Sequence, residues 1–339
     1  MKSKMGFSDL EKIDAHMHYN NFEASLLDQA QSDNFSMISI NTDIPFFDPI
    51  EDQEKIILGL NSNRVFHITA FEMANWNNSN WTEIAIGQIK RGIKNGAIAV
   101  KFWKNIGMAS RDENGNFIMF DHPCFEPIFH FLIENDIPVL AHLGEPKNCW
   151  LPLDEMTMNS DRDYFREHPE YHMAKLPDHP SYEQQLHARD NVLRKYPGLR
   201  FIGAHLASLE WSIERIGSWL DEFTNTAVDM AERICHLQFQ AKDNWHGVRD
   251  FFIEYQDRLL YGSDIIYDKT NDPSEIKNRA YGIWRRDWEF FTTDNTMEVP
   301  QFEGRFKGLK LPDDVILKIY RENALAWYPA LQKKSIAGL

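Results

Sequence analysis

Eight short apolar runs recur along the chain, and polar stretches with helical spacing separate them. Many of the runs are rich in β-branched residues, which are typical of buried strands. The stretch WTEIAIGQIKRGIKNG, between the third and fourth runs, places apolar residues at intervals of three and four before a terminal Asn-Gly, as a helix does. Strands that alternate with helices predict an α/β fold with parallel strands. The runs span residues 12–18, 36–42, 64–71, 97–103, 137–143, 199–206, 225–231 and 258–264.

Two architectures take such a pattern, a closed (β/α)₈ TIM barrel and a doubly wound open sheet. An open sheet of this class usually carries a glycine-rich phosphate loop after its first strand. Here the first run continues into HYNNFEASL, which contains no glycine. We therefore predict a TIM barrel that forms a single domain over residues 1–339. Residues 144–198 and 265–310 are too long for plain helices and are predicted as long loops on the active face of the barrel.

The composition disfavours some classes of binding partner. A net charge of −15 disfavours nucleic acid and anionic membranes, because both repel an acidic surface. No apolar run approaches the roughly 18 residues that a membrane span needs. The start of the chain, MKSKMGFSDL, lacks the apolar core of a signal peptide, and the three cysteines show no CxxC spacing. We expect a cytoplasmic protein with reduced thiols, a small-molecule substrate and, by default, a homodimer.

Polar residues lie at the ends of several predicted strands. His16 and His18 are two residues apart in the first run, so they project to the same side of a strand. Two imidazoles there form half of a site for zinc or a similar divalent ion, although an HxH pair alone is weak evidence. A buried imidazole or charge is costly unless it is paired or bound to a metal, and convergence of several such groups indicates a site. Four further polar residues lie in or at the ends of other runs: Lys101, His142, His205 and Asp264.

The chain resembles the amidohydrolase superfamily of metal-dependent barrel hydrolases, and especially its amidohydrolase 2 branch, which includes decarboxylases and lactonases. The resemblance runs from DAHMH to YRENALAWYP. Its most specific segments are AHLGEP, HPSYEQQLHARDNVLRKYPGLRFIGAHLAS and RLLYGSD. It implies that His205 is a catalytic histidine or a ligand of a second metal. It also implies a set of metal ligands: His16, His18, His142 and Asp264.

Three residues have open roles. In binuclear members of the superfamily a lysine on the fourth strand is carboxylated and bridges two ions, and Lys101 lies in the matching run. The alternative is a cationic Lys101 that binds a substrate carboxylate or pairs with a nearby acid. Arg233 can anchor an anionic substrate group or form a salt bridge with Glu232 or Asp229. Trp103 can line the pocket, although core packing explains most of the ten tryptophans.

The leading hypothesis is hydrolysis of an amide or lactone bond, C–N or C–O, in a small carboxylic acid derivative through a metal-activated water. Asp264 would act as general base, and His205 would orient the water or stabilise the oxyanion. Zinc is the expected cofactor, as one ion or two. The second hypothesis is non-oxidative decarboxylation of a small carboxylic acid, for which the family uses much the same ligands. A non-catalytic barrel is the third, and the intact set of ligands argues against it.

Overall fold

The computed structural model describes residues 6–332, and the strands within this range form one continuous sheet with a separate small hairpin. Neighbouring strands of the sheet are parallel, in the order β8-β7-β6-β5-β4-β3-β2-β1-β9. Each of the eight apolar runs contributes at least one strand of this sheet. The strands are β1 (Lys12–Tyr19), β2 (Phe35–Ile40), β3 (Val65–Ala70), β4 (Val100–Phe102), β5 (Val139–Ala141), β6 (Phe201–Gly203), β7 (Thr226–Asp229), β8 (Leu259–Leu260) and β9 (Ile266–Tyr267).

The segment between β8 and β9 closes the sheet into a barrel. Tyr261 O accepts a hydrogen bond from Ala15 N at 2.9 Å, and Asp264 N donates to His16 O at 2.8 Å. Residues 259–267 therefore run along β1 as one interrupted eighth strand, with β8 paired to β7 and β9 paired to β1. The predicted (β/α)₈ TIM barrel is confirmed.

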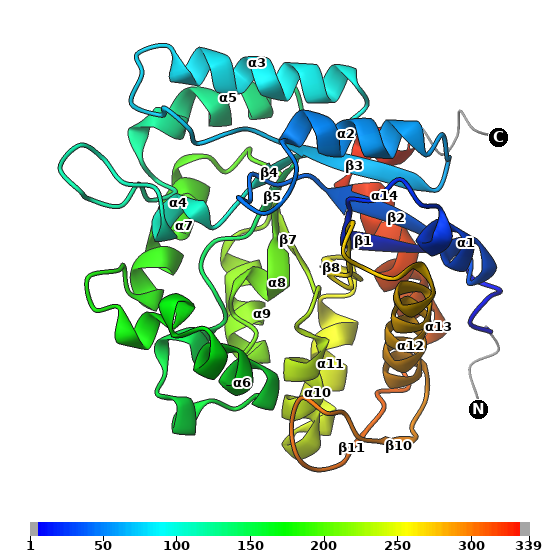
Figure 1. Ribbon diagram of the computed structural model, residues 1–339. Helices are drawn as coiled ribbons and strands as arrows, with labels where there is room; N and C mark the ends of the chain where they lie inside the picture. Colours follow the sequence, from blue (N-terminus) through cyan, green and yellow to red (C-terminus); the bar gives the residue numbers. More distant parts are fainter. Residues whose placement is uncertain (1–5, 333–339) are drawn as a thin grey trace.

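Helices surround the strands on the outside of the barrel (Figure 1). Their apolar faces pack on the strands, as the helical spacing of the sequence predicts. The longer ones are α1 (Ser25–Ser32), α2 (Ile50–Gly59), α3 (Trp81–Lys94), α5 (Glu126–Glu134), α6 (Asn159–Glu167), α7 (Tyr182–Lys195), α9 (Ile213–Glu222), α10 (Ile234–Asp243), α11 (Trp245–Glu254) and α12 (Pro273–Thr292). The shorter ones are α4 (Asn105–Met108), α8 (Ala204–Ala207), α13 (Asp313–Leu317) and α14 (Asn323–Trp327).

The C-terminal segment closes the end of the barrel at which the strands begin. Tyr328 and Leu331 belong to the same buried cluster as the inward-facing strand residues. The Asn323 side chain donates to Leu259 O at 2.8 Å, and the Trp327 indole donates to Asp257 O at 3.0 Å, just before β8. The opposite end, where the strands finish, is thus left to carry a site.

A bulge in β1 sets which of its residues face inward. Asp14 pairs with Met37 of β2, and Met17 pairs with Ser39, so three residue steps on β1 oppose two on β2. Because of this extra residue, the odd-numbered side chains of β1 face inward before the bulge and outward after it. Ile13 and Ala15 belong to the interior cluster, whereas Met17 and Tyr19 belong to the outer one. His16 and His18 therefore face the interior, and Asp14 faces outward.

The two long connections contain regular structure. Residues 144–198 include α6 and α7, with a small core of its own in which Cys149, Phe165 and Met173 are buried. Residues 265–310 include β9, the 20-residue helix α12 and the hairpin of β10 (Thr296–Met297) and β11 (Phe306–Lys307). Among residues 6–332, none of the helices combines the length and the apolarity needed to cross a membrane.

Candidate metal centre

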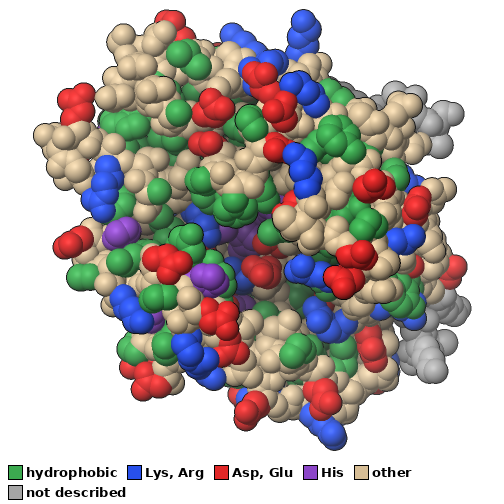
Figure 2. All heavy atoms as spheres, in the orientation of Figure 1, with side chains coloured by type: hydrophobic (Ala, Val, Ile, Leu, Met, Phe, Trp, Pro, Cys, Tyr) green, Lys and Arg blue, Asp and Glu red, His purple; other side chains and the backbone are tan. Residues whose placement is uncertain are grey.

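The histidines of β1 and Asp264 meet at the end of the barrel where the strands finish. Asp264 Oδ1 lies 3.5 Å from the Nε2 atoms of both His16 and His18. This is beyond ordinary hydrogen-bonding distance. Among residues 6–332, neither His16 Nε2 nor Asp264 Oδ1 has a hydrogen-bond partner. Two ligand atoms of a tetrahedral ion, each about 2.1 Å from it, lie roughly 3.4 Å apart, so the three atoms fit a shared divalent ion. Figure 2 shows histidines deep in a hollow, with acidic and basic side chains beside them.

The other ring nitrogen of each imidazole is already engaged. His16 Nδ1 lies 2.7 Å from Asp229 Oδ2, and His18 Nδ1 lies 2.8 Å from Ile40 O. His205 Nδ1 lies 2.9 Å from Ala231 O. Because each acceptor is an oxygen, the assigned tautomer of each ring carries its proton on Nδ1. The lone pair on each Nε2 is then free, as metal ligation requires.

Asp229, at the end of β7, organises the centre, although its position in the sequence predicts only a salt bridge with Arg233. Its Oδ1 accepts from the backbone N–H groups of His205 at 2.9 Å and Ala231 at 3.1 Å, while Oδ2 binds His16. The residue is fully buried. It thus connects β1, β6 and β7. A signal was present in the sequence, since Asp229 is a charged residue within the apolar run at 225–231.

His205 begins a left-handed turn that contains no glycine. Residues 205–208 have φ values of 56°, 58°, 56° and 56°. For such residues this conformation costs roughly 1–2 kcal/mol each, so neighbouring groups must hold it. On α7, Arg189 donates to Ala207 O and Tyr182 donates to Ser208 O. Ser208 Oγ in turn donates to Leu143 O at 2.9 Å, next to His142.

His142 and Lys101 lie near this group. The rings of His142 and His205 have centroids 4.2 Å apart. Within the described residues, two clusters have ligand atoms that all lie within 4.8 Å of one another, and His142 belongs to neither. They are His16–His18–Asp264 and His16–His205–Asp229. Lys101 is 2 % exposed, and its Nζ has no hydrogen-bond partner within the described part of the chain. The assignment of His142 as a ligand and both roles of Lys101 stay predictions.

The electrostatics favour neutral imidazoles beside an ionised carboxylate. Burial lowers the pKa of His18, lowers that of His205 to about 3 and lowers that of His142 well below its usual value. Burial raises the pKa of Asp264, but the imidazoles of His18, His205 and His16 outweigh it, and the pKa falls well below its usual range. Burial also lowers the pKa of Lys101 to about 8. Neutral imidazole and ionised carboxylate are the forms that bind metals.

The two remaining substrate-binding candidates have separate surroundings. Arg233 is 7 % exposed, and its Nη1 donates to Glu232 Oε2 at 3.0 Å. This is the salt bridge with Glu232 that was predicted as the alternative to substrate binding. Trp103 directly follows β4 and is half-buried, and its carbonyl accepts from Ile106 N at 3.1 Å. Its place in a pocket wall stays a prediction.

Glu210, beneath the segment after β5, gives a pH-dependent prediction. It is 1 % exposed, its Oε1 accepts from Lys147 N at 2.8 Å, and burial raises its pKa from 4.5 to about 7. The folded state therefore keeps a proton that the unfolded state releases, and the free energy of unfolding falls as the pH rises between these values. Glu210→Gln is expected to reduce that fall by at most about 3 kcal/mol, measured by urea unfolding at pH 4.5 and 8. Equal falls in both proteins would contradict this.

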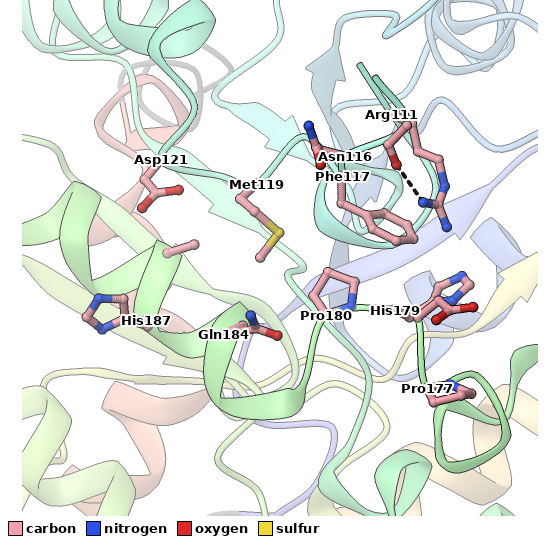
Figure 3. A pocket seen from close by; sticks show the side chains of 13 residues that line it. Arg111, Asn116, Phe117, Met119, Asp121, Pro177, His179, Pro180, Gln184 and His187 are labelled. Carbon is pink, nitrogen blue, oxygen red and sulfur yellow. Dashed lines mark hydrogen bonds between the residues drawn. The ribbon is translucent and has the colours of Figure 1, made fainter. Parts of the chain in front are cut away.

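A surface groove lies apart from these residues. It has a volume of about 560 Å³ and is bordered by residues 111–121 on one side and by residues 177–188 on the other (Figure 3). Phe117 lies between Arg111 and His179, with the guanidinium 3.6 Å from the ring centroid. The groove is lined by none of the residues predicted for the site.

Comparison with known proteins supports this architecture. A sequence model of the family described as Amidohydrolase matches residues 74–330, which is more than half of the chain. No curated protein matches the sequence. Solved structures with a similar fold include an uncharacterised TIM-barrel protein from Bordetella bronchiseptica, which is 14 % identical with a TM-score of 0.53 and covers 95 % of this chain and 100 % of its own.

Two further solved structures resemble the chain at similar levels. The 2,6-dihydroxybenzoate decarboxylase from Rhizobium is 15 % identical with a TM-score of 0.52, over 94 % of this chain and 99 % of the other. Amidohydrolase 2 from Bifidobacterium longum subsp. infantis is 12 % identical with a TM-score of 0.52, over 94 % and 99 %. At these identities the likeness shows the barrel fold alone.

The family match begins after β3, so His16 and His18 lie outside it and their part in the centre rests on the geometry. The matched range contains β4 to β9, with His142, His205 and Asp264. From the extent of this match, the chain belongs to the amidohydrolase family.

Proposed function

We propose that the protein is a zinc-dependent hydrolase that cleaves an amide or lactone bond, C–N or C–O, in a small carboxylic acid derivative. The observation that carries the proposal is the convergence of His16 Nε2, His18 Nε2 and Asp264 Oδ1 at 3.5 Å spacing, at the end of the barrel where such enzymes have their sites. Membership of the amidohydrolase family supports it.

His16, His18 and Asp264 would hold the ion, and His142 is the proposed fourth ligand. A bound divalent ion supplies Lewis acidity, which polarises a carbonyl group. The protein contributes the fixed orientation of the ligands, because Asp229 and Ile40 O hold the Nδ1 atoms of the two β1 histidines. Such support keeps each Nε2 aimed at one point.

Asp264 would accept the proton of the attacking water and pass it to the leaving group. Its low pKa keeps it ionised at neutral pH, which is the form that binds a metal ion. His205 would orient the water. With its proton on Nδ1 toward Ala231 O, its Nε2 can accept a hydrogen bond from water but cannot donate one to an oxyanion. Of the two roles considered for His205, this tautomer supports water orientation.

Lys101 supports decarboxylation as the second candidate. Its buried amine has no hydrogen-bond partner among residues 6–332, so a cationic Lys101 could bind the carboxylate of a substrate before it is lost as carbon dioxide. Arg233 is less suited to that role, because its guanidinium is already paired with Glu232. If the Lys101 amine were neutral and became carboxylated, the resulting anionic carbamate could instead hold two ions, which would favour hydrolysis.

Elemental mass spectrometry of protein purified without chelators tests the centre and counts its ions. We expect about one ion per chain in the wild type and in Lys101→Ala if Lys101 is cationic. Nearly two ions, with the second lost in Lys101→Ala, would establish the carboxylated form. Protein that holds no divalent ion and takes none up on reconstitution would overturn the proposed function.

Isotope labelling separates the two reactions. The metal-loaded protein would be incubated in ¹⁸O-water with panels of small amides, lactones and hydroxybenzoic acids. Hydrolysis places one ¹⁸O atom in the carboxylate of the product and releases no carbon dioxide. Release of carbon dioxide, without ¹⁸O in the remaining product, would contradict hydrolysis and establish decarboxylation.

A further inference from the structure

Asp14 has a set of contacts that the proposed chemistry does not use. It is fully buried and lies on the outer face of β1, beside the bulge. Its Oδ1 accepts from the backbone N–H groups of Ser263 at 3.0 Å and of His16 at 3.3 Å. His16 is a proposed ligand, and Ser263 immediately precedes another, Asp264. One carboxylate oxygen thus joins the backbones of two strands at the residues that must share an ion.

Helix α12 supplies the third donor to this carboxylate. The Trp284 indole donates to Asp14 Oδ2 at 2.9 Å, and Trp284 is itself fully buried. Its ring is stacked on Phe35 with a centroid distance of 4.3 Å, which fixes the direction of the N–H group. One turn further along α12, Asp287 accepts from the Tyr261 hydroxyl at 3.0 Å. Helix α12 therefore contacts β1 through Trp284 and the eighth strand through Asp287.

We propose that Asp14, oriented by Trp284, is a positioning residue that sets the separation of His16 and Asp264 and thereby the metal affinity of the centre. This inference rests on the proposed function only in requiring that the centre binds a metal. A bulge takes backbone groups out of the regular ladder, so another acceptor must fix the local geometry. Asp14 supplies that acceptor, and the Trp284 N–H keeps Oδ1 directed at the two backbone donors.

The hydrogen-bond chemistry gives a test in which the effect of one substitution changes sign. Trp284→Phe removes the donor that orients Asp14 and should weaken metal binding. Asp14→Asn keeps one oxygen for the backbone donors but turns an amide NH₂ toward the Trp284 N–H, so two donors face each other. When Asp14→Asn is already present, adding Trp284→Phe removes this conflict. It should therefore restore binding in that variant, although it weakens binding in the wild type.

The experiment measures the zinc affinity of the metal-stripped proteins by competition with a chromogenic chelator. Asp14→Asn is expected to weaken zinc binding roughly 10- to 100-fold, which is the usual effect of losing a group that orients a metal ligand. The double variant should regain most of this loss. Trp288→Phe is the matched control, because Trp288 lies one turn along α12 and packs on Phe7 and Tyr320. Its zinc affinity should equal that of the wild type.

Urea unfolding of the metal-stripped proteins separates positioning from folding. If Asp14 and Trp284 had a merely structural role, Asp14→Asn and Trp284→Phe would lower the unfolding midpoint without changing the zinc affinity of the folded fraction. This result would overturn the inference, while the proposed function would stand. If Asp14→Asn does not fold, the comparison of Trp284→Phe with Trp288→Phe decides the question. Absence of zinc binding in the wild type would overturn the proposed function and the inference together.

Discussion

His16→Ala is expected to reduce the bound divalent ion from near one per chain to nearly none, and to abolish catalysis with it. His16 is the one residue common to both clusters of metal-binding geometry among residues 6–332. Its Nε2 lies at the same distance from Asp264 Oδ1 as that of His18, so its removal takes away one of the three converging ligand atoms and leaves a tetrahedral site incomplete. Elemental mass spectrometry measures the loss. The matched control is His246→Ala, at an exposed position on α11, which should keep the full metal content. Equal metal in both variants would contradict the assignment.

Asp229→Asn should weaken metal binding less severely than His16→Ala does. Asparagine can keep an oxygen for the N–H groups of His205 and Ala231, but it turns an NH₂ group toward His16 Nδ1. The imidazole must then carry its proton on Nε2, where it blocks the metal. We expect zinc affinity to fall roughly 10- to 100-fold, as for other groups that orient a ligand. An unchanged affinity, measured by chelator competition, would show that Asp229 does not select the tautomer.

Arg189→Met is expected to give the largest loss of stability, about 3 kcal/mol. The 3 % exposed guanidinium donates to Ala207 O within the left-handed turn, pairs with Asp190 Oδ1 at 2.8 Å and lies over the Trp219 ring at 4.7 Å. A buried charged donor that is removed leaves its acceptors unpaired. Removing one partner of a buried ion pair costs roughly 3–5 kcal/mol. We place this loss at the low end of that range, because the Asp190 side chain is 20 % exposed and partly solvated.

The midpoint of urea unfolding measures this loss, provided that the dependence of the free energy on urea is unchanged. Arg194→Met is the matched control on the same helix, since the Arg194 side chain is 51 % exposed and its pair with Glu222 lies at the surface. It should be nearly neutral. If both variants unfold at the same urea concentration, Arg189 does not support the turn that begins at His205.

Two features of the centre were predictable from local patterns. Short apolar runs, separated by stretches with helical spacing, located all eight strands, because a parallel strand that is buried on both faces is apolar along its length. The period of two within a strand placed His16 and His18 on one side of β1. Asp264 was recognisable because a charge at the end of an apolar run is costly without a partner. Asp229 is likewise a charged residue in the apolar run at 225–231. Because it is close to Arg233 in the sequence, it was predicted only as a salt-bridge partner of that residue.

The turn at residues 205–208 was not predictable from its residues. The segment His-Leu-Ala-Ser contains no glycine, the residue that ordinarily indicates positive φ values. What holds it are the side chains of Arg189 and Tyr182 on α7, which reach the carbonyls of Ala207 and Ser208. The residues of the turn themselves do not predict hydrogen-bond donors that come from another helix.

The sequence by itself determined the barrel, the order of its strands and the presence of imidazole and carboxylate groups at strand ends, because these depend on period and on the cost of burying polar groups. Only the tertiary structure decided the geometry of the centre. The bulge that turns Asp14 outward depends on the register of β1 against β2, and the donor that holds Asp14 comes from Trp284, 270 positions along the chain. Register and such distant contacts arise when separate elements pack together, so no short stretch of sequence encodes them.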